Sequence, residues 1–381
     1  MADIKIEVVD SLEGVDPEAW DALTQGNPFV SHAFLHAMHT TRCAVRKTGW
    51  QPQYLLLRDG NGDGDGLAGA MPLYLKGHSR GEYVFDHAWA EAFERHGIDY
   101  YPKLLSAVPF TPVRGPRLMA RDAASREALA HGAITLTQKY GISSLHVLFP
   151  DADDVIALRA AGYLLREGVQ FHWHNASYDS FETFLAGMNH DKRKKIRQDR
   201  RRVADAGVTF RHVQGAAITQ ADLDFFYRCY ASTYENHWSS PYLNPEFFQT
   251  LLAQMPESVL LILAEREGAP IASALNILGD GVLYGRYWGS TEFVSGLHFE
   301  TCYLQAIEFC IQHGVQTFEG GAQGEHKMSR GLLPTPTWSA HWIADERFAE
   351  AIADFLERET KGMGRYLDEL ESHTPFKASA A

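Results

Sequence analysis

The order of the predicted strands and helices occurs twice along the chain, and this repetition limits the folds that the chain can adopt. In the second half, "SVLLILAER" (258–266), "PIASALNIL" (270–278) and "GVLYGRYWG" (281–289) are apolar and aromatic segments separated by short turns. A helix over 297–314 and a buried strand over 315–321 come next. Such segments predict an antiparallel meander that is continued by a helix and a further strand.

The first half follows the same order with different residues. Its predicted elements are strands over 52–59, 67–75 and 82–89, a helix over 125–141 and a strand over 143–149. One more helix and strand complete this half, and a late strand over 337–344 completes the second. The chain is therefore predicted to be an α/β (α+β) protein of two tandem domains, each a mixed, mostly antiparallel sheet flanked by helices.

The length of 381 residues agrees with two domains, because single cores rarely exceed about 250–300 residues. We expect domains over 1–178 and 179–381, with a basic helix over 180–205 bridging them. A Ser at the start of this helix and the "DAG" after it are typical helix ends. Its apolar stripe consists of Phe181, Leu185, Met188, Ile196 and Val203.

The outer surface of this helix carries the segment "HDKRKKIRQDRRR" (190–202), in which eight of thirteen residues are Lys or Arg. The whole chain has a formal charge of −13, so bulk binding of DNA or other nucleic acid is not expected. The segment is either a solvated helix face or a local site for an anion such as phosphate, tRNA or a nucleotide-linked precursor. The anion-binding candidates are Lys194, Lys195, Arg197 and Arg201.

The loop "FEGGAQGEHKMSRG" (318–331) gathers polar residues around four glycines directly after a predicted strand. Such loops at the ends of strands commonly hold ligands in α/β proteins, although a solvated loop is the alternative. The catalytic candidates are Glu319 and Glu325 as bases and His326 as an alternative proton carrier. The substrate-binding candidates are Arg286, Tyr287, Trp288, Gln323, Lys327 and Arg330.

Motifs for metal and nucleotide chemistry are not supported. The segment "DGNGDGDG" (59–66) resembles the start of a calcium loop, but its twelfth position is Ala70, so a hairpin turn is expected. His172 and His174 face one side of a strand, and we expect strand or pocket-lining roles rather than a metal site. Four scattered cysteines without a CxxC pair and no secretory signal favour the cytoplasm, and no transmembrane segment is expected.

Five segments resemble the FemAB-like family, of the peptidoglycan biosynthesis or recognition type, within the GNAT acyl-CoA N-acyltransferase superfamily. They are "GEYVFDHAWAEAFERHGIDYYPKLLSAVPFTPVRGPRL" (81–118), "REGVQFHWHN" (166–175), "RKKIRQDRRRV" (193–203), "LYGRYWG" (283–289) and "GAQGEHKMSRGLLPTPTWSAHWI" (321–343). The resemblance implies tandem GNAT-like domains and transfer of an acyl or aminoacyl group to an amine. It also implies an aminoacyl-tRNA or acyl-CoA co-substrate and no tightly bound cofactor.

The resemblance is incomplete at one motif. A GNAT enzyme binds the CoA pyrophosphate at a Q/R-x-x-G-x-G/A turn after its third strand, and neither "GSTEFVSGLHF" (289–299) nor "FTPVRGPRLM" matches that turn. This departure weighs against acyl-CoA as the donor.

The leading hypothesis is an N-acyltransferase or aminoacyltransferase in which a small-molecule or peptide amine, such as a cell-wall precursor, attacks an activated acyl group. Backbone N–H groups near Tyr287 and Trp288 would stabilise the oxyanion. The alternative is a non-catalytic GNAT-like module that recognises a peptide, a cell-wall fragment or RNA.

Overall fold

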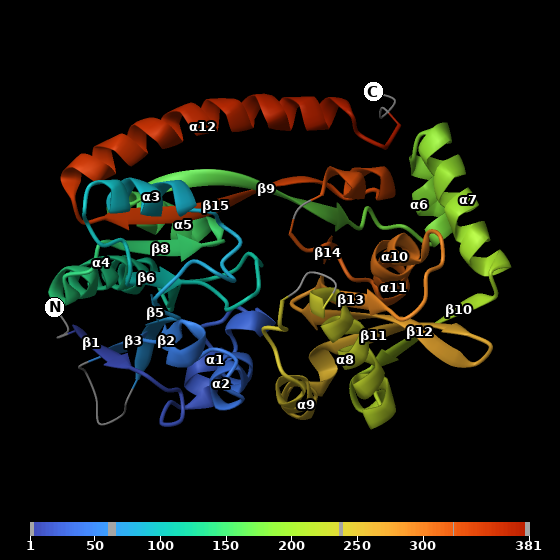
Figure 1. Cartoon of the computed structure of the whole chain (residues 1–381), viewed down its shortest axis with the longest axis horizontal. Helices are drawn as coiled ribbons and strands as arrows, with labels where there is room; N and C mark the ends of the chain where they lie inside the picture. The colour runs from blue at the N-terminus through green and yellow to red at the C-terminus, as the bar shows by residue number, and fades with distance from the viewer. Residues whose placement is uncertain (1–3, 60–65, 236–238, 323, 378–381) are drawn as a thin grey trace. The chain divides into compact units, whose positions relative to one another are not determined.

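The computed structural model describes residues 4–59, 66–235, 239–322 and 324–377, and it consists of two compact units. Unit 1 comprises Met1–Gly168 and Pro336–Tyr366. Unit 2 comprises Val169–Thr335 and Leu367–Ala381. Each unit is therefore built from two separate stretches of the chain (Figure 1).

Unit 1 contains two sets of hydrogen-bonded strands. The first has the order β1-β3-β4-β7 and is antiparallel. The second has the order β2-β5-β6-β8-β15, in which only β6 and β8 are parallel. The strands are β1 (Ile4–Val9), β2 (Trp50–Pro52), β3 (Tyr54–Asp59), β4 (Leu67–Met71), β5 (Tyr74–Lys76), β6 (Lys103–Ser106), β7 (Met119–Ala120), β8 (Ser144–Leu148) and β15 (Leu333–Ile343).

The helices of unit 1 bury their apolar sides on these strands. They are α1 (Pro17–Asp21), α2 (His32–Thr40), α3 (His87–Arg95), α4 (Ala123–Tyr140), α5 (Ala152–Ala160) and most of α12 (Glu346–Ser372). Helix α4 begins where the Asp122 side chain accepts a hydrogen bond from the Ser125 N–H, and it ends at Gly141, whose φ is +63°. Leu129 and Ala133 of α4 belong to the core that contains Leu55 of β3 and Leu145 of β8.

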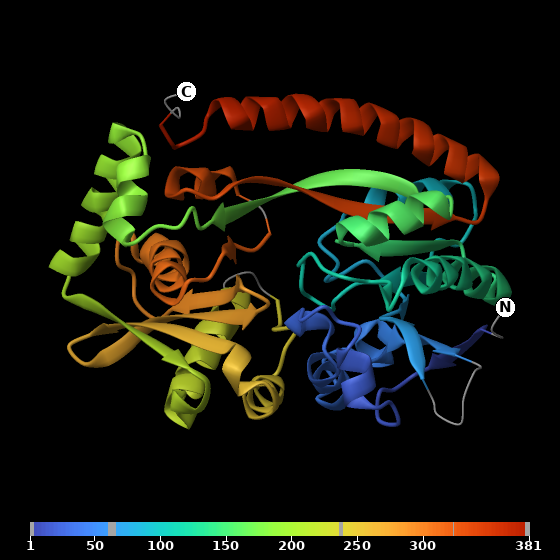
Figure 2. The same ribbon diagram turned by 180° about the vertical axis from the view of Figure 1, so that it is seen from behind.

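Unit 2 is one sheet with helices on both faces. Its order is β10-β11-β12-β13-β14-β9, and only β13 and β14 are parallel. Figures 1 and 2 show α8 on one side of this sheet and α10–α11 on the other. The strands are β9 (Leu164–His174), β10 (Val208–Gln214), β11 (Val259–Arg266), β12 (Ala269–Gly279), β13 (Val282–Ser290) and β14 (Thr317–Glu319).

The helices of unit 2 are α6 (Phe181–Gly187), α7 (His190–Asp205), α8 (Gln220–Glu235), α9 (Pro245–Gln254), α10 (Leu297–Phe299) and α11 (Gln305–His313). A π-helical turn, Glu300–Leu304, joins α10 to α11. Helix α8 lies unusually close to β13, because a Cβ built on Gly289 would be 2.0 Å from the Cys229 carbonyl oxygen. Only glycine allows this backbone approach.

The predicted mixed α/β class is confirmed, and the strands and helix predicted for the second half are β11, β12, β13 and α10–α11. The strand predicted over 82–89 is wrong. The segment instead leads into α3, whose buried side carries Trp89 and Phe93. These two residues are four positions apart, which is the spacing of one helix face.

The predicted helix over 180–205 is two helices, because Met188 and Asn189 have extended ψ angles of 156° and 147°. Both helices lie within unit 2. The chain passes from unit 1 to unit 2 inside β9, between Gly168 and Val169, and not at the predicted boundary near residue 178. It returns inside β15, so the predicted domain of 179–381 differs from unit 2 by the stretch Pro336–Tyr366.

A group of charged side chains that we call the buried ionic cluster (Lys76, Glu82, Asp86 and Lys103) lies inside unit 1, and each residue is less than 5% exposed. The Lys103 Nζ donates to Glu82 Oε2 at 2.7 Å and also to Asp86. Burial opposes ionisation of Asp86, but the adjacent Lys103 ammonium outweighs it and holds the Asp86 pKa below its usual value. Burial lowers the pKa of Lys76 to about 7.

Candidate functional site

Strands β13 and β14 run side by side for only three residue pairs, which end at Tyr284 and Glu319. Strand β13 then continues to Ser290 while the chain after β14 turns into the glycine-rich loop. On its other side, β13 has a bulge against β12: Asn276 faces Gly285 and Leu275 faces Tyr287, so Arg286 is the additional residue. Bulges redirect side chains and backbone groups and are frequent beside functional sites.

Glu319 is the last residue of β14 and is only 8% exposed. It faces His172 directly across the antiparallel β14–β9 pair, and Glu319 Oε1 lies 3.9 Å from His172 Nδ1. His172 is 3% exposed, and its Nε2 lies 3.3 Å from Gln170 Oε1. A buried carboxylate and a buried imidazole thus share one face of the sheet at the point where β13 and β14 separate. The two groups together can accept and pass on a proton.

From the sequence, His172 is predicted only as a strand or pocket-lining residue on the face of β9 that it shares with His174. His174 pairs across the same strands with Thr317, and its Nδ1 lies 3.3 Å from Thr317 Oγ1. The pairing of β9 with β14 brings residues together that are about 150 positions apart in the sequence. No local pattern identifies this partner of Glu319.

Lys327 supports the glycine-rich loop from inside. It is 2% exposed, and its Nζ donates to the carbonyl oxygens of Gly321 at 2.8 Å and Ala322 at 3.1 Å. Burial lowers the Lys327 pKa to about 8, with a smaller contribution from Arg286. Because its ammonium already contacts the loop carbonyls, Lys327 is suited to fixing the loop beside Glu319.

The other polar residues of the loop differ in exposure. Glu325 and His326 are exposed on the helical turn Glu325–Arg330. Partial burial, Lys327 and Arg330 lower the His326 pKa. The Arg330 guanidinium lies 3.7 Å from the Phe299 ring centroid and 3.7 Å from Asp199 Oδ2. Gln323 lies outside the described residues.

The aromatic residues of β13 contact the helices on both faces of the sheet. The Tyr287 ring centroid is 4.9 Å from that of Tyr230 on α8. The Trp288 ring centroid is 4.8 Å from that of His298 in α10, a residue that is not among the sequence-based candidates. Burial, together with the nearby His326, Arg330 and Lys327, lowers the His298 pKa to about 4.

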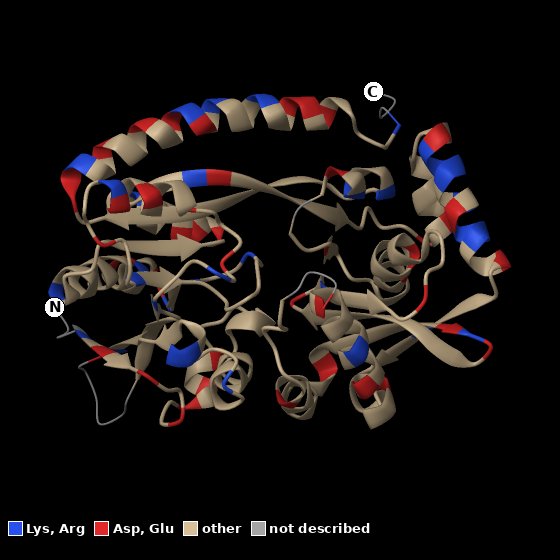
Figure 3. Cartoon of the chain, in the orientation of Figure 1, with Lys and Arg blue, Asp and Glu red and all other residues tan. Residues whose placement is uncertain are grey.

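The four predicted anion-binding residues are exposed on the basic helix α7. Figure 3 shows the blue Lys and Arg positions along this helix, with red acidic positions between them. Lys195 pairs with Asp199 at 2.8 Å, and Arg197 pairs with Glu182 at 2.5 Å. Lys194 and Arg201 have no ion-pair partner among the residues that the structure describes. The four residues share one helix but do not converge on the Glu319 side chain through any described contact.

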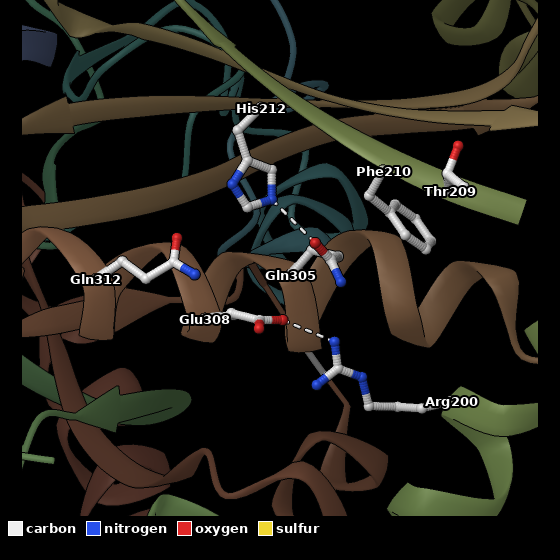
Figure 4. A pocket seen from close by; sticks show the side chains of 7 residues that line it. All are labelled: Arg200, Thr209, Phe210, His212, Gln305, Glu308 and Gln312. Carbon is white, nitrogen blue, oxygen red and sulfur yellow. Dashed lines mark hydrogen bonds and ion pairs between the residues drawn. The ribbon is translucent and has the colours of Figure 1, made fainter. Parts of the chain in front are cut away.

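A separate hollow of about 470 Å³ lies beside α7 and is lined by Arg200, Thr209, Phe210, His212, Gln305, Glu308 and Gln312 (Figure 4). Arg200 is fixed at its edge by ion pairs to Glu300 at 3.0 Å and Glu308 at 2.7 Å. His212 Nε2 lies 3.0 Å from Gln305 Oε1. Arg200 is thus neutralised within the protein, unlike Lys194 and Arg201.

Among the described residues, no group of three or more His, Cys, Asp or Glu could hold a metal ion. Within the same residues, no helix is both long and apolar enough to cross a membrane. The site around Glu319 contains the buried Glu319 and His172 side chains, backbone groups of a bulged strand and a glycine-rich loop held by Lys327.

Within this mixed α/β fold, the buried Glu319 and His172 side chains lie where the parallel strands β13 and β14 separate. The chain belongs to the FemAB-like family, described as peptidoglycan biosynthesis/recognition, whose model matches residues 11–378. No curated protein matches the sequence.

Solved structures support the fold. FemX has a TM-score of 0.56 at 12% identity, with 89% of this chain and 98% of FemX covered. A conserved protein of unknown function from Bacteroides thetaiotaomicron has a TM-score of 0.54 at 10% identity, with 90% and 100% covered. The L-PGS of Bacillus licheniformis has a TM-score of 0.53 at 11% identity, with 85% and 91% covered. The chain is similar in fold to all three over most of its length.

Proposed function

We propose that this protein transfers an acyl or aminoacyl group from an activated donor to a substrate amine, with Glu319 and His172 as the proton-carrying pair. The observation that carries the proposal is the position of the buried Glu319 carboxylate, 3.9 Å from His172, where β14 ends and β13 continues. The family description supports an amine of a peptidoglycan precursor or peptide as the acceptor.

The reaction needs one proton transfer and one stabilised oxyanion. The amine nitrogen attacks the carbonyl carbon of the donor, and a C–N bond forms. The C–O bond of an aminoacyl ester, or the C–S bond of a thioester, then breaks. The attacking amine loses a proton to Glu319 directly or through His172, and that proton leaves with the departing hydroxyl or thiol. Backbone N–H groups of Tyr287 and Trp288 are the proposed donors to the oxyanion.

The proposal includes two classes of donor, an aminoacyl ester and an acyl thioester. The FemX and L-PGS folds and the unmatched pyrophosphate turn favour an aminoacyl ester, so aminoacyl-tRNA is the first donor to test. Acetyl-CoA is the second. No tightly bound cofactor is required by either reaction, because both donors carry their own activation.

The test is transfer of a labelled acyl group to amines by the purified full chain. A mixture of charged tRNAs and acetyl-CoA would be offered separately, with peptides that contain lysine or a diamino acid as acceptors, and products would be found by mass spectrometry. Glu319→Gln should lower turnover by about 10²–10⁴-fold, because a general base typically contributes that much. Glu325→Gln is the matched control, since Glu325 is exposed on the same loop.

The alternative is a non-catalytic module that binds a peptide, cell-wall fragment or RNA. It would be favoured if neither donor supported transfer while one of these ligands raised the thermal unfolding temperature of the full chain. Full activity of Glu319→Gln would instead remove Glu319 from the mechanism.

A further inference from the structure

Unit 2 presents an aromatic side chain almost completely to solvent. Phe293, in the loop between β13 and α10, is 94% exposed, more than any other large apolar residue described. Burial of a fully hydrated Phe ring is favourable, because it removes a large apolar surface from water. Such a position is therefore a candidate for contact with another apolar phase.

The loop that carries Phe293 is held in place by its neighbours on both sides. Val294 packs against the small core that contains Val203 of α7. A Cβ on Gly296 would lie 3.5 Å from Val203 and 3.6 Å from the Asp199 carbonyl oxygen, so the loop also lies against α7. Glu292 forms an ion pair with Arg266. Phe293 is thus exposed on an anchored loop beside the basic helix.

Two cations of helix α7 that have no described ion pair lie on the side opposite its buried face. Ile196 and Val203 are buried, and these two residues define the inner face. Lys194 and Arg201, seven residues apart and therefore on one face, are exposed and have no ion-pair partner among the described residues. Lys195, Arg197 and Arg202 lie beside them with acidic partners.

We propose that Lys194, Arg201 and Phe293, which we call the α7–Phe293 surface, dock this protein on an anionic lipid surface. Basic residues beside a membrane attract anionic headgroups, and an aromatic ring at the interface adds apolar burial. The attraction to anionic headgroups is limited to this surface, because the chain as a whole has a formal charge of −13. The surface places unit 2 at a membrane.

The shape of the surface favours a lipid layer over RNA. Lys194 and Arg201 lie on the outer face of α7, and neither residue lines the hollow beside Arg200. Single-stranded RNA is usually held in a basic groove with several stacking rings, whereas an outward helix face and one exposed ring suit a planar layer.

The experiment measures sedimentation of the full chain with vesicles, without any activity readout, so it is independent of the proposed transfer reaction. Vesicles of phosphatidylcholine alone would be compared with vesicles that contain about one third phosphatidylglycerol. We expect binding only to the anionic vesicles, and a decrease in binding as salt is raised. Lys194→Ala and Arg201→Ala should each weaken partitioning about fivefold. Phe293→Ser should weaken it about tenfold.

Two matched controls distinguish the α7–Phe293 surface from general charge and apolarity. Arg358→Ala with Arg365→Ala removes two exposed arginines, also seven apart, from α12. Phe85→Ser removes a Phe that is 59% exposed in unit 1. Both control variants should bind anionic vesicles like the unmodified protein.

Three results would overturn the proposal. These are equal binding to neutral and anionic vesicles, no binding to either, and equal loss in the control and α7–Phe293 variants. Binding of a tRNA mixture that is lost in Lys194→Ala and Arg201→Ala, with vesicle binding absent or unchanged, would assign the same cations to RNA instead.

Discussion

At the scale of single residues, the interior of unit 1 contains two histidines whose hydrogen bonds allow little freedom in protonation. His146 Nδ1 lies 2.7 Å from His341 Nδ1, so one ring donates and the other accepts. Each Nε2 lies 2.9 Å from a serine hydroxyl, that of Ser144 or of Ser339. Burial lowers the His146 pKa to about 3 and holds the His341 pKa well below its usual value.

The pair predicts a loss of stability in mild acid. Below the unfolded pKa of about 6.5, the unfolded chain binds protons that the folded pair does not, so the free energy of unfolding decreases as pH falls from about 6.5. The slope should reach about 1.4 kcal/mol per pH unit for each histidine. Urea unfolding at several pH values checks this. A His146→Gln variant, although less stable, should show a shallower slope; an unchanged slope would contradict the assignment.

Around the candidate site, His172 and His174 offer a comparison on one strand. His172→Gln should lower turnover in the transfer reaction, because it removes the imidazole beside Glu319. His174→Gln should retain activity, since His174 is exposed and contacts Thr317 instead. Equal activity of the two variants would show that His172 carries no proton in the reaction, while Glu319→Gln tests the carboxylate separately.

At the scale of elements, the contact between α8 and β13 depends on a missing side chain. Gly289→Ala would force a Cβ against the backbone of Cys229, and α8 or β13 must then shift. We expect a loss of about 1–3 kcal/mol or more in unfolding free energy. Gly362→Ala, inside α12 with open space around it, should instead stabilise by about 0.5–1 kcal/mol. Chemical denaturation of both variants checks the pair of predictions.

The buried ionic cluster joins β5, β6 and α3 through charge. Lys103→Met would leave Glu82 and Asp86 without their main cation, and breaking a buried pair in this way typically costs about 3–5 kcal/mol. The same substitution at Lys361, which pairs with Glu357 on the exposed side of α12, should not change stability measurably. A small loss for Lys103→Met would mean that the two carboxyl groups take up protons in its place.

At the scale of the whole molecule, the strands and helices with strong apolar periodicity could be predicted from the sequence. Strands β11, β12 and β13 and the helical segment α10–α11 after them follow from local patterns of apolar residues. The strand prediction for 82–89 is wrong, because the short apolar spacing of this segment fits a strand as well as the first turn of α3. Glu319 could be selected from its position after a strand, but its partner His172 depends on long-range strand pairing.

The two-part composition of unit 1 has a consequence for the order in which the chain folds during synthesis. Strand β8 pairs with Ser339–Ile343 of β15, and the core around Trp89 needs Ile352 and Leu356 of α12. A ribosome that has made the first 178 residues has therefore released none of these partners. Unit 1 has to wait, with one edge of β8 unpaired, until β15 and the first half of α12 have also emerged. The nascent chain would present this edge to chaperones while unit 2 is being synthesised.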